Sequence, residues 1–280
     1  MPELPEVESV VRVLRDGVPT LVGLRIVTVN VAWDGVLSDA NGDLDVAELE
    51  GCGFISVARH GKYLIFHLEC PRKPSRDLII HLRMTGRLFL VPHNEALARH
   101  TRLVLMLNNG LALRFDDPRK FGRAWLVDDA ATIIGRLGPD ALKLDPAEFC
   151  ARLARHRRQL KPLLLDQSCV AGIGNIYADE SLFRAGLHPQ AISSELASDE
   201  IRRLHSAITS VLEEAVEAQG ANIDGVFKAG RFAVSVYGRQ GAPCRVCGSE
   251  IRKIRVGQRG THYCPECQVL SPGDVPHPET

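Results

Sequence analysis

The chain opens with Pro2-Glu3-Leu4-Pro5-Glu6-Val7-Glu8, a heptad that leads directly into an amphipathic segment. Apolar residues stand at positions 7, 10, 11 and 14, the spacing of one buried helix face, and Gly17 comes after them. Pro5 suits the first turn of a helix, where a backbone N–H is not needed. The pattern therefore predicts a helix over residues 5–16 with a short lead-in before it.

Pro2 becomes the terminal residue once Met1 is removed, and the small side chain after Met1 favours that removal. An α-amine titrates near pH 8, so roughly 10% of it is neutral at pH 7, against under about 0.1% for an ordinary lysine. Since only a neutral amine attacks a carbonyl carbon, such a terminus is a ready Schiff-base nucleophile. The heptad alone leaves open the simpler possibility that Pro2 only stiffens the lead-in.

Strand signals dominate the region up to about residue 130, and helical periodicity dominates the next ninety or so residues. Asn109-Gly110 is a hairpin signal. We expect an α+β protein: the first helix packs at the edge of an antiparallel β-sandwich, and a helical domain comes after it. The predicted strands are 24–33, 53–59, 62–69, 77–84, 86–91, 102–108, 111–116 and 121–127; the predicted helices are 146–156, 160–166, 175–185 and 198–219. The predicted domains are 1–130 (sandwich), 131–220 (helical), 221–243 (a loop or linker) and 244–270 (a cysteine module).

The 280 residues carry 34 basic and 34 acidic side chains, so the formal net charge is zero. The charges are unevenly placed, however. Residues 34–50 hold six acids and no Lys or Arg, residues 152–161 hold five bases and no acid, and residues 228–262 hold eight bases against Glu250 alone. This polarity predicts one anion-binding face and an acidic back. The chain has no apolar run of bilayer length and no secretory signal pattern, so a cytoplasmic location is the expected default. A monomer is the default expectation too, and no sequence feature bears on it.

The eight cysteines fall into two groups. Four of them form C-x2-C-x16-C-x2-C, the spacing of two knuckles that close a tetrahedral structural zinc site with no open coordination position: Cys244, Cys247, Cys264 and Cys267. The alternating sequence between the knuckles predicts a β-hairpin with Arg259 at its tip. The other four are scattered, and we expect them to be unpaired in a reducing compartment: Cys52, Cys70, Cys150 and Cys169.

The segment Val170–Asn175 contains two glycines and leads into a predicted helix. Backbone N–H groups at such a helix start form a phosphate seat. A tight turn between helices that needs glycine for packing explains the same residues, and the segment alone does not decide between the two roles.

Taken together, these motifs resemble the formamidopyrimidine-DNA glycosylase family along essentially the whole chain. The matching segments occur in the family's order: Pro2–Glu8, Gly61–Leu64, His81–Gly86, Asp117–Gly122, Gly172–Tyr177, Tyr237–Arg239, and the four-cysteine finger with Gln258-Arg259-Gly260. The resemblance implies a helix-two-turn-helix arrangement in the helical domain. It also implies a bifunctional glycosylase and abasic-site lyase that acts on oxidised purines in duplex DNA, with one structural Zn²⁺.

The resemblance implies four catalytic or supporting roles near the N-terminus. Pro2 attacks C1′ of the damaged nucleotide, releases the base and forms an imine, after which β- and δ-elimination cut the strand. Glu3 protonates the deoxyribose ring oxygen, a role that needs a carboxyl group at contact distance. Glu6 orients the site, and Lys62 contacts a phosphate and assists elimination.

The resemblance also implies residues that hold DNA. An enzyme that extrudes a base needs apolar side chains to fill the gap and a donor for the orphaned partner base. Met84 and Phe121 fit the first need, and Arg119 fits the second. Phosphates are gripped by Asn175 and by Arg259, which we also count with the catalytic set, and the remaining DNA-binding residues are His81 and Tyr237.

Two features depart from the family pattern. Arg83 stands before Met84 where many members have Gly, and the segment 220–237 is several residues shorter than usual. Since the corresponding segment of the family caps an extruded 8-oxoguanine, the resemblance implies that formamidopyrimidines are handled as well or better. Three alternatives remain: an endonuclease VIII-like glycosylase for oxidised pyrimidines, a non-catalytic damage-binding protein, and a zinc-ribbon protein that binds RNA or another protein. Leu4 and the set Met84, Arg119 and Phe121 argue against the first of these.

Overall fold

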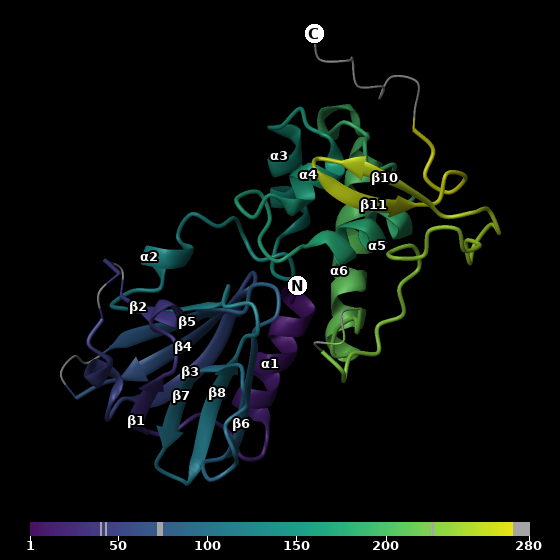
Figure 1. Cartoon of the computed structure of the whole chain (residues 1–280). Helices are drawn as coiled ribbons and strands as arrows, with labels where there is room; N and C mark the ends of the chain where they lie inside the picture. Colours follow the sequence, from purple (N-terminus) through teal and green to yellow (C-terminus); the bar gives the residue numbers. More distant parts are fainter. Residues whose placement is uncertain (40, 43, 72–74, 224, 226, 271–280) are drawn as a thin grey trace. The chain divides into compact units, whose positions relative to one another are not determined.

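The computed structural model describes residues 1–270 apart from 40, 43, 72–74, 224 and 226. It divides into two compact units, which are described separately (Figure 1). The first unit contains Met1–Arg136 and Asn222–Lys228, and the second contains Leu137–Ala221 and the chain from Ala229 onward. Among the described helices, none is both long and apolar enough to cross a bilayer.

The predicted first helix is confirmed as α1 (Leu4–Asp16). Val7, Val11 and Leu14 are fully buried on one face, as the spacing requires. At the C-terminal end of the helix, Gly17 N–H donates to Val13 O (3.1 Å) and closes the last turn. The helix packs against β3, β4 and β6 of the first unit (Figure 1).

The first unit is a sandwich of two sheets whose strand orders are β1-β7-β8-β6 and β2-β9-β5-β4-β3. All eight predicted strands form, and only their ends differ from the predicted ones. The two-residue strand β2, too short to show a period in the sequence, pairs in parallel with β9, whereas all other pairs are antiparallel. The bounds are β1 Ile26–Val31, β2 Leu37–Ser38, β3 Gly53–His60, β4 Tyr63–Glu69, β5 Arg76–His81, β6 Arg87–Pro92, β7 Thr101–Leu107, β8 Leu111–Asp116 and β9 Arg123–Val127.

The core of the first unit lies between the sheets and under α1. Alternate residues of facing strands, such as Leu64 and Phe66 on β4 and Leu113 and Phe115 on β8, are at most 1% exposed. Each such side chain contributes about 1.5–3 kcal/mol when fully buried. Short helical turns (η1 Asp34–Val36, η2 Val46–Leu49, α2 Ala131–Ile134) connect or flank the strands.

Strand register brings three connections to one end of the sandwich, here called the loop end: residues 61–62, 82–86 and 117–122. His60 pairs with Tyr63, Tyr63 with His81, and His81 with Arg123, so β3, β4, β5 and β9 all begin or finish there. On the other sheet, Arg87 pairs with Asp116 at the same end. The sequence-distant motifs of the first unit therefore meet in space.

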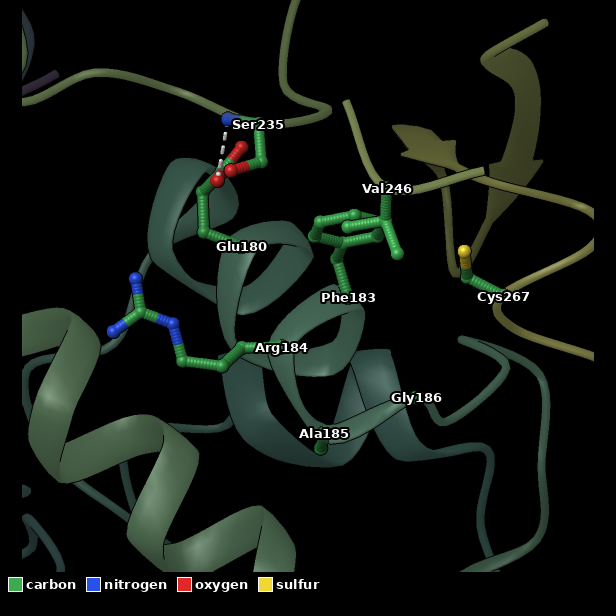
Figure 2. Close-up of a pocket in the computed structure, with 8 residues that line it drawn as sticks. All are labelled: Glu180, Phe183, Arg184, Ala185, Gly186, Ser235, Val246 and Cys267. Carbon is green, nitrogen blue, oxygen red and sulfur yellow. Dashed lines mark hydrogen bonds between the residues drawn. The ribbon is translucent and has the colours of Figure 1, made fainter. Parts of the chain in front are cut away.

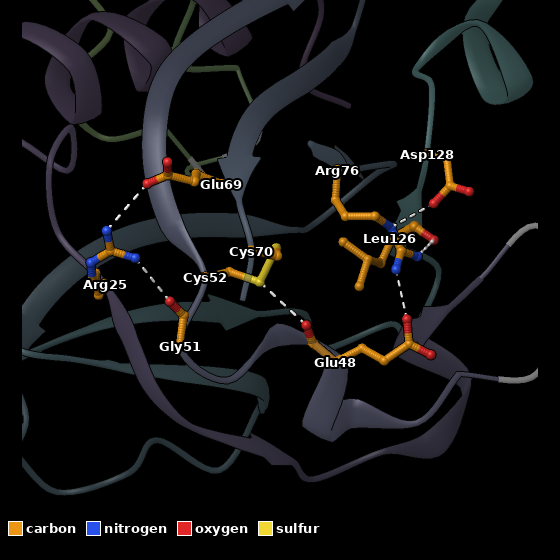
Figure 3. The surroundings of a disulfide bond; sticks show 9 residues. All are labelled: Arg25, Glu48, Gly51, Cys52, Glu69, Cys70, Arg76, Leu126 and Asp128. Atoms are coloured by element: carbon orange, nitrogen blue, oxygen red, sulfur yellow. Dashed lines mark hydrogen bonds and ion pairs between the residues drawn. A yellow bond between two sulfur atoms is a disulfide. The ribbon is translucent and has the colours of Figure 1, made fainter. Parts of the chain in front are cut away.

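The expectation that Cys52 and Cys70 are unpaired is wrong, because they form a disulfide (Figure 3). Gly53 pairs with Glu69, and extending this register by one residue sets Cys52 opposite Cys70, with Cα atoms 4.1 Å apart. The bond closes the β3–β4 hairpin at the end opposite residues 61–62. Cys150 and Cys169 are free, as expected.

The second unit holds the predicted helices and the cysteine hairpin. Residues 175–185 form a helix with the predicted bounds, and the other helices end two residues or fewer from theirs. Tyr177 and Leu182 of α5 and Leu212 of α6 are fully buried between the helices. The elements are α3 Pro146–Ala154, α4 Leu160–Leu165, α5 Asn175–Ala185, η3 Ser193–Glu195, α6 Ser198–Glu217, β10 Arg252–Val256 and β11 Arg259–Tyr263.

Candidate active site

The start of α1 buries two carboxyl groups next to Pro2. Glu3 and Glu6 are 2% and 3% exposed, and Glu3 N–H donates to Glu6 Oε2 (2.9 Å). Pro2 is itself buried, while Met1 is exposed. Removal of Met1 would therefore leave a terminal amine beside two carboxyl groups that are shielded from water, the surroundings that a proton-transferring carboxyl needs.

A buried arginine ties α1 to the turn that carries Lys62. Arg59 Nε pairs with Glu8 Oε2 (2.9 Å), and Arg59 Nη1 donates to Gly61 O (2.9 Å). Lys62 comes directly after and is 6% exposed. The contact holds the second turn of α1 against a turn more than fifty residues away in sequence. The sequence analysis missed Arg59 and Glu8, because no local pattern links the two positions.

His81 lies next to this turn as a neutral ring. Burial lowers the pKa of His81 to about 3, with further lowering from the charges of Arg83 and Lys62. Its Nδ1 accepts a hydrogen bond from Arg83 N–H (2.9 Å), so the single proton of the neutral ring lies on Nε2. His81 therefore presents a hydrogen-bond donor without carrying a charge, which suits contact with a phosphate oxygen.

The three residues expected to fill the gap left by an extruded base lie together at the loop end. Arg119 Nη1 lies 3.2 Å from Met84 Sδ, and its guanidinium stacks on Phe121 with Cζ 4.6 Å from the ring centroid. Met84 is 40% exposed and Phe121 47% exposed, unusual for such apolar side chains unless they contact a partner. The structure thus brings together residues that the sequence places 35 positions apart.

Buried Asp117 supports this arrangement. Its Oδ1 accepts from Thr85 Oγ1 (2.5 Å) and from Arg119 N–H (3.2 Å), and its Oδ2 accepts from Gly122 N–H (2.7 Å). A Cβ at Gly122 would lie 2.3 Å from the Phe115 ring, so the loop needs glycine there. One carboxylate therefore joins the 82–86 turn to the 117–122 loop.

In the second unit, the expected phosphate-binding residues also converge. Asn175 is the first residue of α5, and its Nδ2 donates to Gly260 O (3.3 Å) and to Tyr237 Oη (3.4 Å). Gly260 is the neighbour of Arg259, which is exposed at the start of β11. The helix start and the hairpin tip thus share hydrogen bonds.

A fully buried ion pair, which the sequence did not predict, contacts the backbone of the β10–β11 hairpin. Lys161 Nζ lies 2.7 Å from Asp179 Oδ1, both side chains being 0% exposed, and it also donates to Gly260 O (2.9 Å). Asp179 Oδ2 accepts from His262 N–H (2.9 Å). Breaking such a pair by removing one partner typically costs about 3–5 kcal/mol.

The backbone around Tyr237 is held by another buried carboxylate. Glu180 of α5 accepts hydrogen bonds from the N–H groups of Ser235 (2.7 Å), Val236 (2.9 Å) and Tyr237 (2.8 Å). Figure 2 shows Glu180 beneath Ser235 at the rim of a pocket beside the zinc knuckles. A glutamate within a helix gives no sequence signal of this role.

The four cysteines fit one zinc ion. Their sulfur atoms all lie within 4.8 Å of one another, with Cys244 to Cys267 at 3.9 Å and Cys247 to Cys264 at 3.4 Å. A tetrahedron with Zn–S bonds of about 2.3 Å has edges of roughly 3.8 Å. Four thiolates fill the coordination sphere, so the metal is structural.

Three family models match successive parts of the chain. Residues 1–124 match the family described as the formamidopyrimidine-DNA glycosylase N-terminal domain, 137–225 its H2TH domain, and 241–269 the zinc finger found in FPG and IleRS. Formamidopyrimidine-DNA glycosylases of Solibacter usitatus and Herpetosiphon aurantiacus are 42% and 41% identical over 96% of this chain and cover 99% and 100% of their own length. The chain belongs to the formamidopyrimidine-DNA glycosylase family.

Solved structures of the family are similar along the same length. A complex of the Lactococcus lactis enzyme with DNA containing an abasic site has a TM-score of 0.85 at 33% identity. Its complex with DNA containing N7-benzyl-Fapy-dG has a TM-score of 0.86 at 34% identity. Both comparisons cover 96% of this chain and 100% of the other.

The segment expected to cap a lesion is described only in part, since residues 224 and 226 lie outside the described residues. Asn222–Lys228 belongs to the first unit, although the chain directly before it and directly after it belongs to the second. Phe227 packs against the core of the first unit. Its part in lesion choice stays a prediction.

Proposed function

We propose that this protein is a DNA glycosylase and abasic-site lyase that removes oxidised purines from duplex DNA in base excision repair. After loss of Met1, the Pro2 amine attacks C1′ of the everted nucleotide while Glu3 protonates the ring oxygen. The C1′–N bond to the base breaks, and the resulting imine makes the C2′ proton acidic. Loss of that proton expels the 3′ phosphate, and a second elimination expels the 5′ phosphate.

Other residues of the chain hold the substrate in this proposal. Lys62 and His81 contact phosphate oxygens near the reacting sugar, Lys62 as a charge and His81 as a neutral donor. Arg119 donates to the orphaned base, with Met84 and Phe121 filling the space beside it. Phosphate contacts orient the duplex without reading its sequence, which suits an enzyme that searches for damage.

One observation carries the proposal: the α1 start with its two buried carboxyls is tied through Arg59 to the Lys62 turn, at the loop end where Met84, Arg119 and Phe121 lie together. A core-packing role would bury Met84 and Phe121, and they are exposed. Relatives solved with abasic and formamidopyrimidine DNA supply the substrate class. A monomer acting in the cytoplasm on chromosomal DNA completes the proposal.

Borohydride trapping on a duplex with an abasic site tests the chemistry, because reduction of the imine leaves protein covalently attached to DNA. Wild-type protein is expected to trap. Pro2→Gly should be impaired in both base release and strand cleavage, and Glu3→Gln should lose base release yet still act on preformed abasic sites. Normal DNA binding without any trapping would instead support the non-catalytic damage-binding alternative.

We also propose that the short capping segment makes formamidopyrimidine release at least as fast as 8-oxoguanine release. Single-turnover rates on two duplexes that differ only in the lesion provide the measurement. A strong preference for 8-oxoguanine would contradict it.

A further inference from the structure

Two cationic side chains of the first unit converge on one tryptophan ring. Lys120 Nζ lies 5.7 Å and Arg123 Cζ 4.9 Å from the centroid of Trp33. We call these three residues the cationic platform. Lys120 belongs to the 117–122 loop and Arg123 begins β9, whereas Trp33 comes after β1, so three segments meet here.

The platform is held in place before any ligand arrives. Arg123 Nη1 donates to Lys120 O (3.1 Å) and to Gly122 O (2.9 Å), which fixes the guanidinium against its own loop. Lys120 has φ +58°, a left-handed conformation that lysine seldom adopts. Such backbone strain persists only where the surroundings enforce it, and it is common at binding sites.

Within the part of the chain that the structure describes, the positive charges of the platform form no ion pair with an acidic side chain. No ion pair among the described residues joins Arg119, Lys120 or Arg123 to a carboxylate. Asp117, the acid within the loop, is buried and accepts from Thr85 and from backbone N–H groups. Like charges held close together repel, so an anion bound between them gains from both.

The platform lies beside the residues that the proposed function uses. Arg123 pairs with His81 across β9 and β5, and Lys120 stands between Arg119 and Phe121 in the chain. All of them belong to the loop end of the sandwich. A ligand on the platform would therefore be part of the same duplex that the wedge of Met84, Arg119 and Phe121 enters.

We propose that Lys120 and Arg123 bind a backbone phosphate of the duplex, away from the everted nucleotide, with Trp33 as the floor that positions both cations. This inference rests on the proposed function, since it assigns one more contact to the same DNA. The cation–π stacking explains how the two side chains are held over the ring although no described carboxylate pairs with them. This phosphate contact lets the enzyme bind undamaged duplex while it searches for a lesion.

Salt dependence separates a phosphate contact from a structural role. Each neutralised phosphate contributes about 0.9 to the slope of log affinity against log salt concentration. Because the two cations share one phosphate, the double variant Lys120→Met/Arg123→Met should lower the slope magnitude by about 0.9 on undamaged duplex and weaken binding roughly three- to tenfold at 0.1 M salt. Each single variant should lower the slope magnitude by less. Arg123→Lys, which keeps the charge, should keep the slope. Trp33→Leu should weaken binding with a smaller change in slope.

Arg25→Met is the matched control, since Arg25 is an exposed arginine of the same unit that pairs with Glu69 beside the disulfide, at the end opposite the loop end (Figure 3). Its slope should equal the wild-type value. An unchanged slope in the double variant Lys120→Met/Arg123→Met would overturn the proposal, as would equal slope losses in Arg123→Lys and Arg123→Met. Borohydride trapping with the same protein preparations tests the proposed function separately. If wild-type protein binds DNA with the expected salt slopes but forms no covalent adduct with abasic-site DNA, the proposed chemistry is refuted and the proposed phosphate contact still stands.

Discussion

Two β-hairpins of this protein each carry a basic residue and a cysteine crosslink, yet one is stabilised mainly by a hydrophobic core and the other mainly by its metal site. The β3–β4 hairpin carries Lys62 at its tip, sits inside a sandwich, and has a disulfide at its base. The β10–β11 hairpin carries Arg259, forms a sheet of its own, and relies on four cysteines for zinc. Lys62 is buried, whereas Arg259 is exposed.

The difference shows where a cysteine crosslink matters. In β3–β4, ladder hydrogen bonds and core side chains such as Leu64 and Phe66 already specify the geometry, so the disulfide adds to an existing structure. The small cluster around β10–β11 contains Val236, Ile251 and two of the cysteines themselves. Without metal, so small a core cannot offset the entropy of ordering the hairpin.

The largest expected effect is therefore zinc removal. Chelation, or Cys264→Ser, should abolish the hairpin and weaken DNA binding at least about a hundredfold, because metal binding supplies on the order of 10 kcal/mol of folding free energy to such a module. Metal content by mass spectrometry and affinity by fluorescence anisotropy check this. Full affinity in metal-free protein would show that the hairpin supports itself.

Next comes the buried pair beneath the second hairpin. Lys161→Met should lower the free energy of unfolding by about 3–5 kcal/mol, since buried Asp179 loses the ammonium group that pairs with it. DNA affinity should fall as well, because Gly260 loses a hydrogen bond next to Arg259. In the double variant Lys161→Met/Asp179→Leu, stability should partly recover while affinity stays low. Recovery of both would mean that the pair contributes only to stability.

A smaller effect is expected at the base of the first hairpin. Reduction of the disulfide, or Cys52→Ser with Cys70→Ser, should lower stability by about 3 kcal/mol, the value for a closed loop of this length. Cleavage rates should not change, since the bond lies at the far end of the hairpin from Lys62. Denaturant titration with and without reductant, followed by an activity assay, gives both values. A loss of activity in folded, reduced protein would show that the base and the tip are coupled.

The smallest effect concerns the pH dependence of stability through His81, which ends β5 beside the tip of the first hairpin. The pKa of His81 is about 3 in the folded protein and near 6.5 when unfolded, so the unfolded chain binds a proton first as pH falls. Stability is therefore complete above pH 6.5 and decreases below it, by about 2 kcal/mol between pH 7 and pH 5. His81→Asn should reduce this pH dependence when unfolding is measured across that range. If the pH dependence of stability is the same in His81→Asn as in the wild type, a group other than His81 is responsible for it.

Much of the candidate site was predictable because its signals are local. Helix periodicity located α1 and α5, turn residues located the loops that carry Met84 and Arg119, and cysteine spacing located the zinc ligands. The roles of Pro2, Glu3 and Lys62 came from the motif order and stay predictions until trapping is done.

By itself, then, the sequence determined the longer strands and helices, their order, the zinc ligand set and the family, because each depends on motifs of residues a few positions apart. Only the tertiary structure decided the Cys52–Cys70 bond, the Arg59–Glu8 and Lys161–Asp179 pairs, and the stacking of Lys120 and Arg123 on Trp33. The physical reason is that strand register and burial bring residues into contact that are distant in sequence. The partner of a charged group or a thiol therefore cannot be identified until the fold has buried both side chains at the same place.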